Sequence, residues 1–418
     1  MKQQPTDPPA SPEPACHCEA RAGRWRAGNY QGTRATKRVI FSLRVIFISC
    51  ILLSCTSGEE HANKRSHGPV YIAMVAPLSG PLSEFGWSML RGGRMRIEEG
   101  KEKTLRNGRV VKLMALDDRG RAQQAIRLAT NMSSHQSIVA VIGHLTTVCT
   151  LSAVPVYESA QLVLVSPVAT GADLESIKSP YVFRTILSES QQAMSLADSM
   201  YRTMDGKEVA LICEDSPLGN RLRNSFISRS REIGLSVRDI PAGSDPFPDL
   251  AEAIDKIVES RAGAIFLAGG PRLAALIVRK WPEKIDRPLI FGTYRLISEE
   301  FSEVAGIHNR GILAAHPCVW RSDFERGRDV KDRYENRFKY SMDWLAIQAY
   351  DAIDLLLWAM QRSGIGADSI RDTLQGLDSK NQSLPGLAGP IHFNPNGSLA
   401  RDVTVASYTG SGWKIREN

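Results

Sequence analysis

The sequence predicts an α/β protein built from two similar halves, and three observations point to this class. Short, fully apolar runs rich in β-branched residues, such as residues 138–142, are typical of strands covered on both faces of a parallel sheet. These runs alternate with helical stretches, which favours right-handed βαβ units with helices on both faces of the sheet. The alternation starts again near Ser188. We therefore expect two α/β halves in succession.

The first half is expected to hold four strands and three helices. The strands are predicted at residues 70–75, 110–116, 138–142 and 161–165. A loop carrying Phe85 and Trp87 is expected to precede the first helix, which runs through residues 90–97. The other two helices are predicted at residues 122–132 and from Thr146 and Thr147 to a closing Pro155.

The second half repeats this alternation and then crosses back. Strands are predicted at residues 208–213, 235–240, 264–268, 288–291 and 312–315, and helices at residues 193–201, 221–233, 250–260 and 272–280. The longest apolar helix, residues 343–361, contains Asp351 and Asp354, which favours a helix that covers a core over one that spans a membrane. Late strands are expected at residues 390–393 and 402–408. Two α/β halves joined by crossings imply a ligand cleft at the carboxyl ends of their strands.

The first 54 residues are predicted to be a leader. Residues 1–36 are rich in Pro, Ala and Arg and show no apolar period, so they are interpreted as unfolded or as lying upstream of the true start. Basic residues at positions 37, 38 and 44 then precede a ten-residue apolar run, 45–54, which has the length of a signal-peptide core and is too short to span a bilayer. Its end, Leu52-Leu53-Ser54-Cys55, resembles a bacterial lipobox, in which Cys55 would carry the lipid. A secretory signal cut a few residues later is the alternative.

Composition excludes several classes of protein. The chain has 418 residues, of which 43% are hydrophobic and 23% charged, and it carries a formal charge of +7. A net +5 lies before Cys55, so only +2 remains for the rest, and a basic nucleic-acid surface is not supported. Beyond Cys55 only Cys149, Cys213 and Cys318 remain, which is no metal-ligand pattern. Cys149 and Cys213 are expected to be small buried hydrophobes.

A candidate binding feature follows the strand at residues 138–142. Gly143 ends this strand, and the hydroxyls of Thr146 and Thr147 stand where the next helix begins. Such a helix start presents free amides to a crevice and attracts a carboxylate or another acceptor group. Simple capping of the helix by these threonines is the alternative. His144 has no partner at metal-ligand spacing and is expected to be packed and hydrogen-bonded, and Asp117 with Asp118 is not expected to form a metal or acid–base site.

Several segments resemble, in the right order, the periplasmic leucine/isoleucine/valine-binding protein family. These are the type I solute-binding components of ABC importers. The resemblance covers about residues 70–413, and it is carried by the segments VAPLSGPLSEFG (75–86), VIGHLTTVCTLSAVPVYE (141–158), LVSPVATGADL (164–174), FRT (183–185), ALICEDSPLGN (210–220) and AGPIHFNPNG (388–397).

The resemblance implies a type I periplasmic-binding-protein fold, in which two Rossmann-like lobes are joined by a three-stranded hinge. The crossings would fall near residues 184–187, 314–317 and 399–403. Lobe 1 would comprise residues 70–187 plus 316–400, and lobe 2 residues 188–315 plus 401–418, after a leader (1–54) and a linker (55–69). The family grips an amino-acid carboxylate at positions that match Thr146, Thr147, Ala169 and Thr170, and it covers the ligand with an aromatic residue that matches Phe85.

The second half of the expected site departs from the family pattern. Leu218 stands where members commonly have Tyr, and Thr293-Tyr294-Arg295 stands where the acid that pairs with the ligand ammonium should lie. A buried ammonium without a counter-charge is costly, so either Glu214 or Asp215 serves instead, or the ligand is not an α-amino acid. The candidate ligand-binding residues are Phe85, Thr146, Thr147, Ala169, Thr170, Glu214, Asp215, Leu218 and Tyr294, with Arg295 as a weaker candidate.

The resemblance implies an extracytoplasmic lipoprotein that binds a small amino-acid-like or carboxylate/amide solute and delivers it to an ABC permease. No catalytic residue, metal, cofactor or nucleic-acid partner is expected. The alternative keeps the fold and changes the role, to a ligand sensor or a scaffold that regulates an envelope enzyme. An extracytoplasmic hydrolase is a third possibility, but no Ser/His/Asp or metal constellation supports it.

Overall fold

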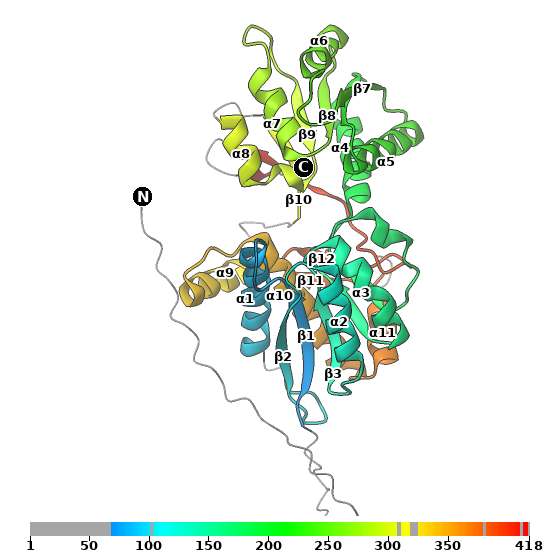
Figure 1. The fold of residues 1–418 in the computed structure, drawn as a ribbon, viewed down its shortest axis with the longest axis vertical. Coiled ribbons are helices and arrows are strands. Elements are labelled where there is room, and N and C mark those ends of the chain that lie inside the picture. The colour runs from blue at the N-terminus through cyan, green and yellow to red at the C-terminus, as the bar shows by residue number, and fades with distance from the viewer. Residues whose placement is uncertain are drawn as a thin grey trace, which may run out of the picture. The chain divides into compact units, whose positions relative to one another are not determined.

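A computed structural model describes residues 68–100, 103–306, 311–317, 325–378, 382–409 and 413–416. The predicted leader, Cys55 and most of the predicted linker lie outside the described residues. Within the described part the protein is α/β with two parallel-rich sheets (Figure 1), which confirms the predicted fold class.

The first sheet is wholly parallel and has the order β2-β1-β3-β4-β5. Its strands are β1 (Val70–Ala76), β2 (Val111–Asp117), β3 (Ile138–Gly143), β4 (Val163–Ser166) and β5 (Val182–Arg184). Every residue of β3 and β4 is buried, as expected for strands covered on both faces.

Helices cover both faces of the first sheet. Apolar residues of α1 (Ser83–Glu99), α10 (Trp344–Ser363) and α11 (Ala367–Gln375) pack together on one face, and those of α2 (Ala122–Ser133) and α3 (Thr147–Ser159) pack on the other. A further helix, α9 (Glu325–Phe338), packs against α1 and α10. Segments from both ends of the described chain therefore build this half.

The second sheet has the order β14-β13-β10-β9-β8-β6-β7, with a parallel body and an antiparallel edge. Its strands are β6 (Val209–Glu214), β7 (Val237–Gly243), β8 (Ala264–Ala268), β9 (Leu289–Gly292), β10 (Ile312–His316), β13 (Thr404–Tyr408) and β14 (Trp413–Ile415). One face packs against α4 (Glu189–Thr203) and α5 (Pro217–Ile233). The other face packs against α6 (Leu250–Ser260), α7 (Pro271–Lys280) and α8 (Glu299–Ala305).

Smaller elements complete the fold. The hairpin β11 (Leu384–Gly386) and β12 (Gly389–Ile391) packs against α10, and short 3-10 helices, η2 (Ala172–Ser176) and η3 (Tyr294–Leu296), follow β4 and β9.

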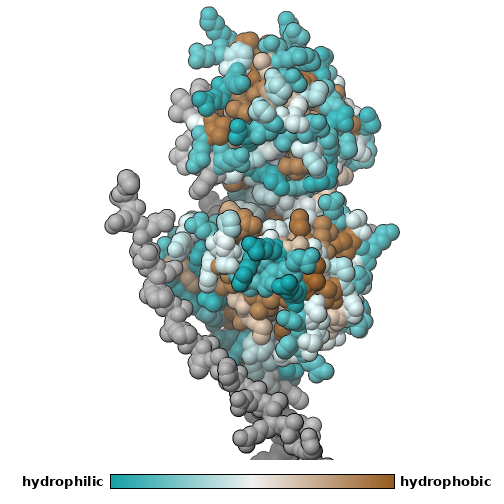
Figure 2. Space-filling view, viewed as in Figure 1, coloured by the Kyte–Doolittle hydropathy of each residue, from teal (hydrophilic) through white to brown (hydrophobic). Residues whose placement is uncertain are grey.

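On the face shown in Figure 2, polar and charged residues cover much of the surface and hydrophobic residues form small patches between them. Within the described residues, none of the helices combines the length and the apolar character that crossing a membrane requires.

Two expectations about helix limits are wrong. Phe85 and Trp87 lie in the first turns of α1 and not in a loop, because the Trp87 indole donates to the Leu78 carbonyl at 3.0 Å and Gly86 lets the helix approach the backbone of Pro77. Pro155 does not close α3, which continues to Ser159. The helix tolerates this proline because packing of residues beyond it, such as the fully buried Tyr157, outweighs one lost hydrogen bond.

A buried carboxylate ties α10 to the hairpin. Asp351 accepts hydrogen bonds from the amides of Leu387 and Ala388, both at 2.7 Å. Burial raises the pKa of Asp351 to about 7, against the opposing effect of these two amides. The folded protein therefore holds the Asp351 proton more tightly than the unfolded chain does.

This shift predicts that folding stability falls as the pH rises. The raised folded pKa adds stability that is present below the unfolded pKa of Asp and is lost as the pH rises towards about 7, by up to about 1.4 kcal/mol per pH unit. Urea unfolding between about pH 5 and 8 measures the free energy of unfolding. The Asp351→Asn variant should show a smaller pH dependence, whereas Asn at the exposed Asp332 should leave it unchanged. Equal slopes in all three proteins would contradict this assignment.

Candidate functional site

Each sheet has one point at which the order of its strands reverses. In the first sheet the order reverses between β1 and β3, and in the second sheet it reverses between β6 and β8. In open α/β sheets, the segments after neighbouring strands run to opposite sides of such a point, and ligands bind in the crevice between them. Most of the residues described below come from the segments after β3, β4, β5, β6, β8 and β9.

The two threonines at the start of α3 have different roles. Thr146 is the N-cap, and its hydroxyl accepts a hydrogen bond from the Cys149 amide at 3.2 Å. The Thr147 hydroxyl accepts instead from the amide of Gly171, at 3.0 Å, in the segment after β4. Of the two interpretations of this pair, capping therefore applies to Thr146, whereas Thr147 joins two strand ends.

The segment after β4 packs closely on Thr147. A side chain at Gly171 would meet the Thr147 methyl group at 2.3 Å, so this approach requires glycine. The preceding residues, Ala169 and Thr170, are 1% and 4% exposed. The structure thus brings three predicted residues, Thr147, Ala169 and Thr170, into one corner.

Thr170 connects this corner to residues around the second sheet. Its carbonyl accepts from the amide of Glu189, the first residue of α4, at 2.9 Å. Its hydroxyl lies 3.1 Å from the hydroxyl of Tyr294 in η3. Tyr294 was predicted from the sequence as a ligand contact, and the structure places it against the predicted Thr170.

Tyr294 is itself held by residues that the sequence did not single out. Its amide donates to Oε1 of Gln192 at 3.1 Å, and its ring meets the ring of Trp344 edge-on, with centroids 5.6 Å apart. Trp344 is the first residue of α10, about fifty residues further along the chain, and no local pattern marks it. Only the fold brings it to this position.

A buried acid lies beside this contact. Glu189 is 2% exposed, and its Oε1 accepts from Nη2 of Arg295 at 2.9 Å. Nη2 of Arg221, in α5, lies 3.6 Å from the other carboxylate oxygen. Burial opposes the charge on Arg295, but Tyr294 and Glu189 outweigh it and raise the pKa of the guanidinium. The sequence analysis did not single out Glu189.

The remaining predicted residues lie on other parts of the two halves. The Glu214 carboxylate accepts from the amide of Gly270 at 2.7 Å and so joins the ends of β6 and β8. Asp215 is exposed and lines a separate hollow of about 450 Å³ with Arg223 and Asp239. Leu218 packs partly buried against the core between α4, α5 and the second sheet. Phe85 is 50% exposed.

His144 belongs to a buried hydrogen-bond network. Its Nδ1 lies 2.7 Å from Oδ2 of Asp118, its Nε2 lies 3.0 Å from the Tyr157 hydroxyl, and both His144 and Asp118 are 0% exposed. Burial raises the pKa of Tyr157. This confirms the prediction of a packed, hydrogen-bonded histidine. Cys149 and Cys213 are buried free thiols, as predicted.

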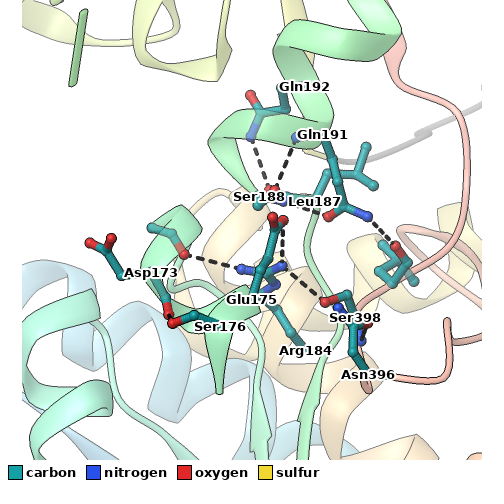
Figure 3. Close-up of polar contacts among 12 residues, drawn as sticks. Asp173, Glu175, Ser176, Arg184, Leu187, Ser188, Gln191, Gln192, Asn396 and Ser398 are labelled. Carbon is teal, nitrogen blue, oxygen red and sulfur yellow. Dashed lines mark hydrogen bonds and ion pairs between the residues drawn. The ribbon is translucent and has the colours of Figure 1, made fainter. Parts of the chain in front are cut away.

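One arginine fastens the segment that crosses from β5 to α4 (Figure 3). Arg184, 3% exposed, donates to the Gly171 carbonyl at 3.2 Å, to Glu175 at 3.0 Å and to the Ser398 hydroxyl at 3.2 Å. Close by, Gln191 donates to the Leu399 carbonyl at 2.7 Å, and Ser188 and Gln191 cap α4 reciprocally. The corner at Gly171 is therefore linked to two of the crossing segments.

The arrangement has the chemistry of a binding site. The hydroxyls of Thr147, Thr170 and Tyr294 lie at strand ends, beside the charged trio of Arg295, Glu189 and Arg221. Within the described residues, no group of three His, Cys, Asp or Glu side chains is placed to hold a metal ion.

Comparison with known proteins identifies the family. The model of the family described as periplasmic binding protein matches residues 69–412. A Leu/Ile/Val-binding protein homolog from Brucella melitensis is 24% identical over 355 residues, which cover 84% of this chain and 94% of that protein. The chain belongs to the periplasmic binding protein family, as its sequence motifs predicted, and members of this family are binding proteins rather than enzymes.

Solved structures agree on the fold. An ABC transporter substrate-binding protein from Desulfitobacterium hafniense superposes with a TM-score of 0.70 at 21% identity, covering 84% of this chain and all of that chain. A solute binding protein of an ABC transporter from R. palustris, solved in complex with benzoate, gives a TM-score of 0.63 at 16% identity and covers 83% and 95% of the two chains. Both likenesses concern the fold.

Proposed function

We propose that this protein is the solute-binding component of an ABC importer and that it binds a small amino-acid-like or carboxylate/amide solute between its two halves. One observation carries this proposal: Thr170, held at the end of β4, meets Tyr294 from the end of β9, so strand ends of both sheets meet at one point. Strand ends of this kind are where open α/β sheets bind ligands. The names of the relatives, which refer to leucine-type amino acids and to benzoate, support a small carboxylate-bearing solute.

The proposed contacts divide between the two halves. Thr147, Ala169 and Thr170 would hold the acceptor end of the solute, and Phe85 would cover its apolar part. Tyr294, with Glu214 or Asp215, would complete the contact from the second half. Thr146 supports this set as the cap of α3.

Binding would drive closure of one half on the other. We assign residues 70–187 plus 316–400 to one lobe and residues 188–315 plus 401–418 to the other. A solute that contacts both lobes binds the closed state more tightly than the open state and so shifts the equilibrium towards closure. The permease would then recognise the closed form. We further propose that the protein works outside the cytoplasm, anchored by lipid on Cys55.

A thermal-shift screen of amino acids, amides and small carboxylates tests this function. A solute present at about 100 times its dissociation constant should stabilise the folded state by about 2.7 kcal/mol and raise the unfolding temperature. No stabilisation by any compound, even at large excess, would contradict transport and favour a regulatory scaffold with this fold.

Thr147 offers a sharper test within the site. The Thr147→Val variant keeps the shape of the side chain but loses the hydroxyl that holds Gly171, so we expect affinity for the solute found in the screen to fall at least about tenfold. Thr147→Ser keeps the hydroxyl and should retain most of the affinity. Titration calorimetry measures both variants. Unchanged affinity in the valine variant would remove Thr147 from the site.

The lipid anchor predicts a change of location. In a bacterial host the wild-type protein should sediment with membranes, and a Cys55→Ser variant should be released into the soluble extracytoplasmic fraction, because it cannot be acylated. Immunoblots of the two fractions measure this, with Cys50→Ser as the matched control that keeps the predicted lipidation site. Persistent membrane association of the Cys55 variant would contradict the proposal.

A further inference from the structure

Two arginines share a single buried carboxylate next to the proposed site. Arg295 follows Tyr294 directly, and its guanidinium contacts Oε1 of Glu189 through Nε at 3.2 Å and Nη2 at 2.9 Å. Arg221 approaches Oε2 of the same carboxylate from α5. The trio therefore carries a net charge of +1.

The trio is contiguous with the corner at Thr170. The Glu189 amide donates to the Thr170 carbonyl, and the Tyr294 hydroxyl lies against the Thr170 hydroxyl. The side chains of Arg295 and Arg221 remain 39% and 36% exposed, whereas that of Glu189 is only 2% exposed. The two arginine side chains are therefore partly accessible and the acid between them is not, although Nε of Arg221 itself is buried.

The trio is also incompletely satisfied. Among the residues that the structure describes, the buried Nε of Arg221 has no hydrogen-bond partner. Oε2 of Glu189 also has none, because its distance of 3.6 Å to Nη2 of Arg221 is longer than a hydrogen bond, but this buried oxygen already faces a guanidinium group. A buried donor that lacks an acceptor costs free energy, and an added acceptor oxygen recovers it. Guanidinium groups match carboxylate and similar oxygen groups in geometry as well as in charge.

Each acid near the site is already engaged, so a ligand ammonium would find no uncompensated carboxylate here. Glu189 is already shared by two arginines, and the carboxylate of Glu214, the other acid nearby, already accepts the Gly270 amide. Repulsion from two guanidinium groups adds to the cost of burying an ammonium.

We propose that this trio receives an oxygen acceptor group of the solute, which makes the solute an organic acid with an acceptor at each end and no ammonium group. A dicarboxylate and a hydroxy-substituted aromatic acid share this chemistry. The inference rests on the proposed function, because it uses the same site. One acceptor end would lie at the Thr147 and Thr170 corner and the other at Arg295 and Arg221.

Titration calorimetry with four probes tests this inference on the wild-type protein. Glutarate and L-glutamate differ only in an amino group, so glutarate should bind at least tenfold more tightly if the solute is a dicarboxylate. 4-Hydroxybenzoate should bind at least tenfold more tightly than L-leucine if the solute is a hydroxy-aromatic acid. Tighter binding of either amino acid than of both acids would overturn the inference and leave the proposed function standing. No heat from any of the four, even at millimolar concentration, would count against both.

Variants of Arg295 test whether this arginine causes the preference for acids over amino acids. Arg295→Gln should lower affinity for the preferred acid at least tenfold without lowering affinity for the amino-acid probe. Arg295→Lys keeps the positive charge but loses the paired N–H donors of the guanidinium, so its affinity for the acid should lie between those of the wild type and the glutamine variant. Arg238→Gln removes an exposed arginine of β7 that pairs with Glu208 and is the matched control. Circular dichroism shows whether each variant is folded. Equal losses for acids and amino acids, or no loss in a folded Arg295→Gln protein, would overturn the assignment.

Discussion

The rest of the site depends on how Thr170 is held. Its carbonyl accepts the amide that begins α4 and its hydroxyl meets Tyr294, while the next residue, Gly171, is fixed by Thr147 on one side and by Arg184 on the other. A short segment after β4 thus contacts the start of α3, the segment crossing to α4 and the end of β9. A solute that displaces or joins any one of these contacts affects the others, which is what coupling between binding and closure requires.

The charges around this segment shape which solutes can bind. Hydroxyls and amides at the Thr147 corner suit an acceptor group in any member of such a fold. The second half differs, because its buried acid is already neutralised by Arg295 and approached by Arg221. Selectivity then follows from the net positive charge of the trio and from the unpaired donor of Arg221, which favour an oxygen acceptor over an ammonium group. One fold can in this way serve different solutes through a few residues at its strand ends.

Local patterns in the sequence predicted the parts of the fold that depend on local chemistry. The buried strand ending at Gly143, the threonine cap and the packed His144 followed from apolar runs and spacing. Such patterns did not predict where α1 begins or that α3 continues beyond Pro155, because both depend on the tertiary contacts of Trp87 and Tyr157. Glu189 and Trp344 reach the site from segments far from Tyr294, and no local signal identifies such partners. The sequence showed that Tyr294 and Arg295 depart from the family pattern, but it did not show that Glu189 pairs with Arg295.

We expect a solute to bind where strand ends of both halves meet, and hydrogen–deuterium exchange with and without the most stabilising compound of the screen tests this most directly. The account predicts that amides of residues 168–171, after β4, and of residues 293–296, after β9, gain protection together, because one solute orders both segments. Protection confined to one half, or found only around Arg223 and Asp239, would contradict it.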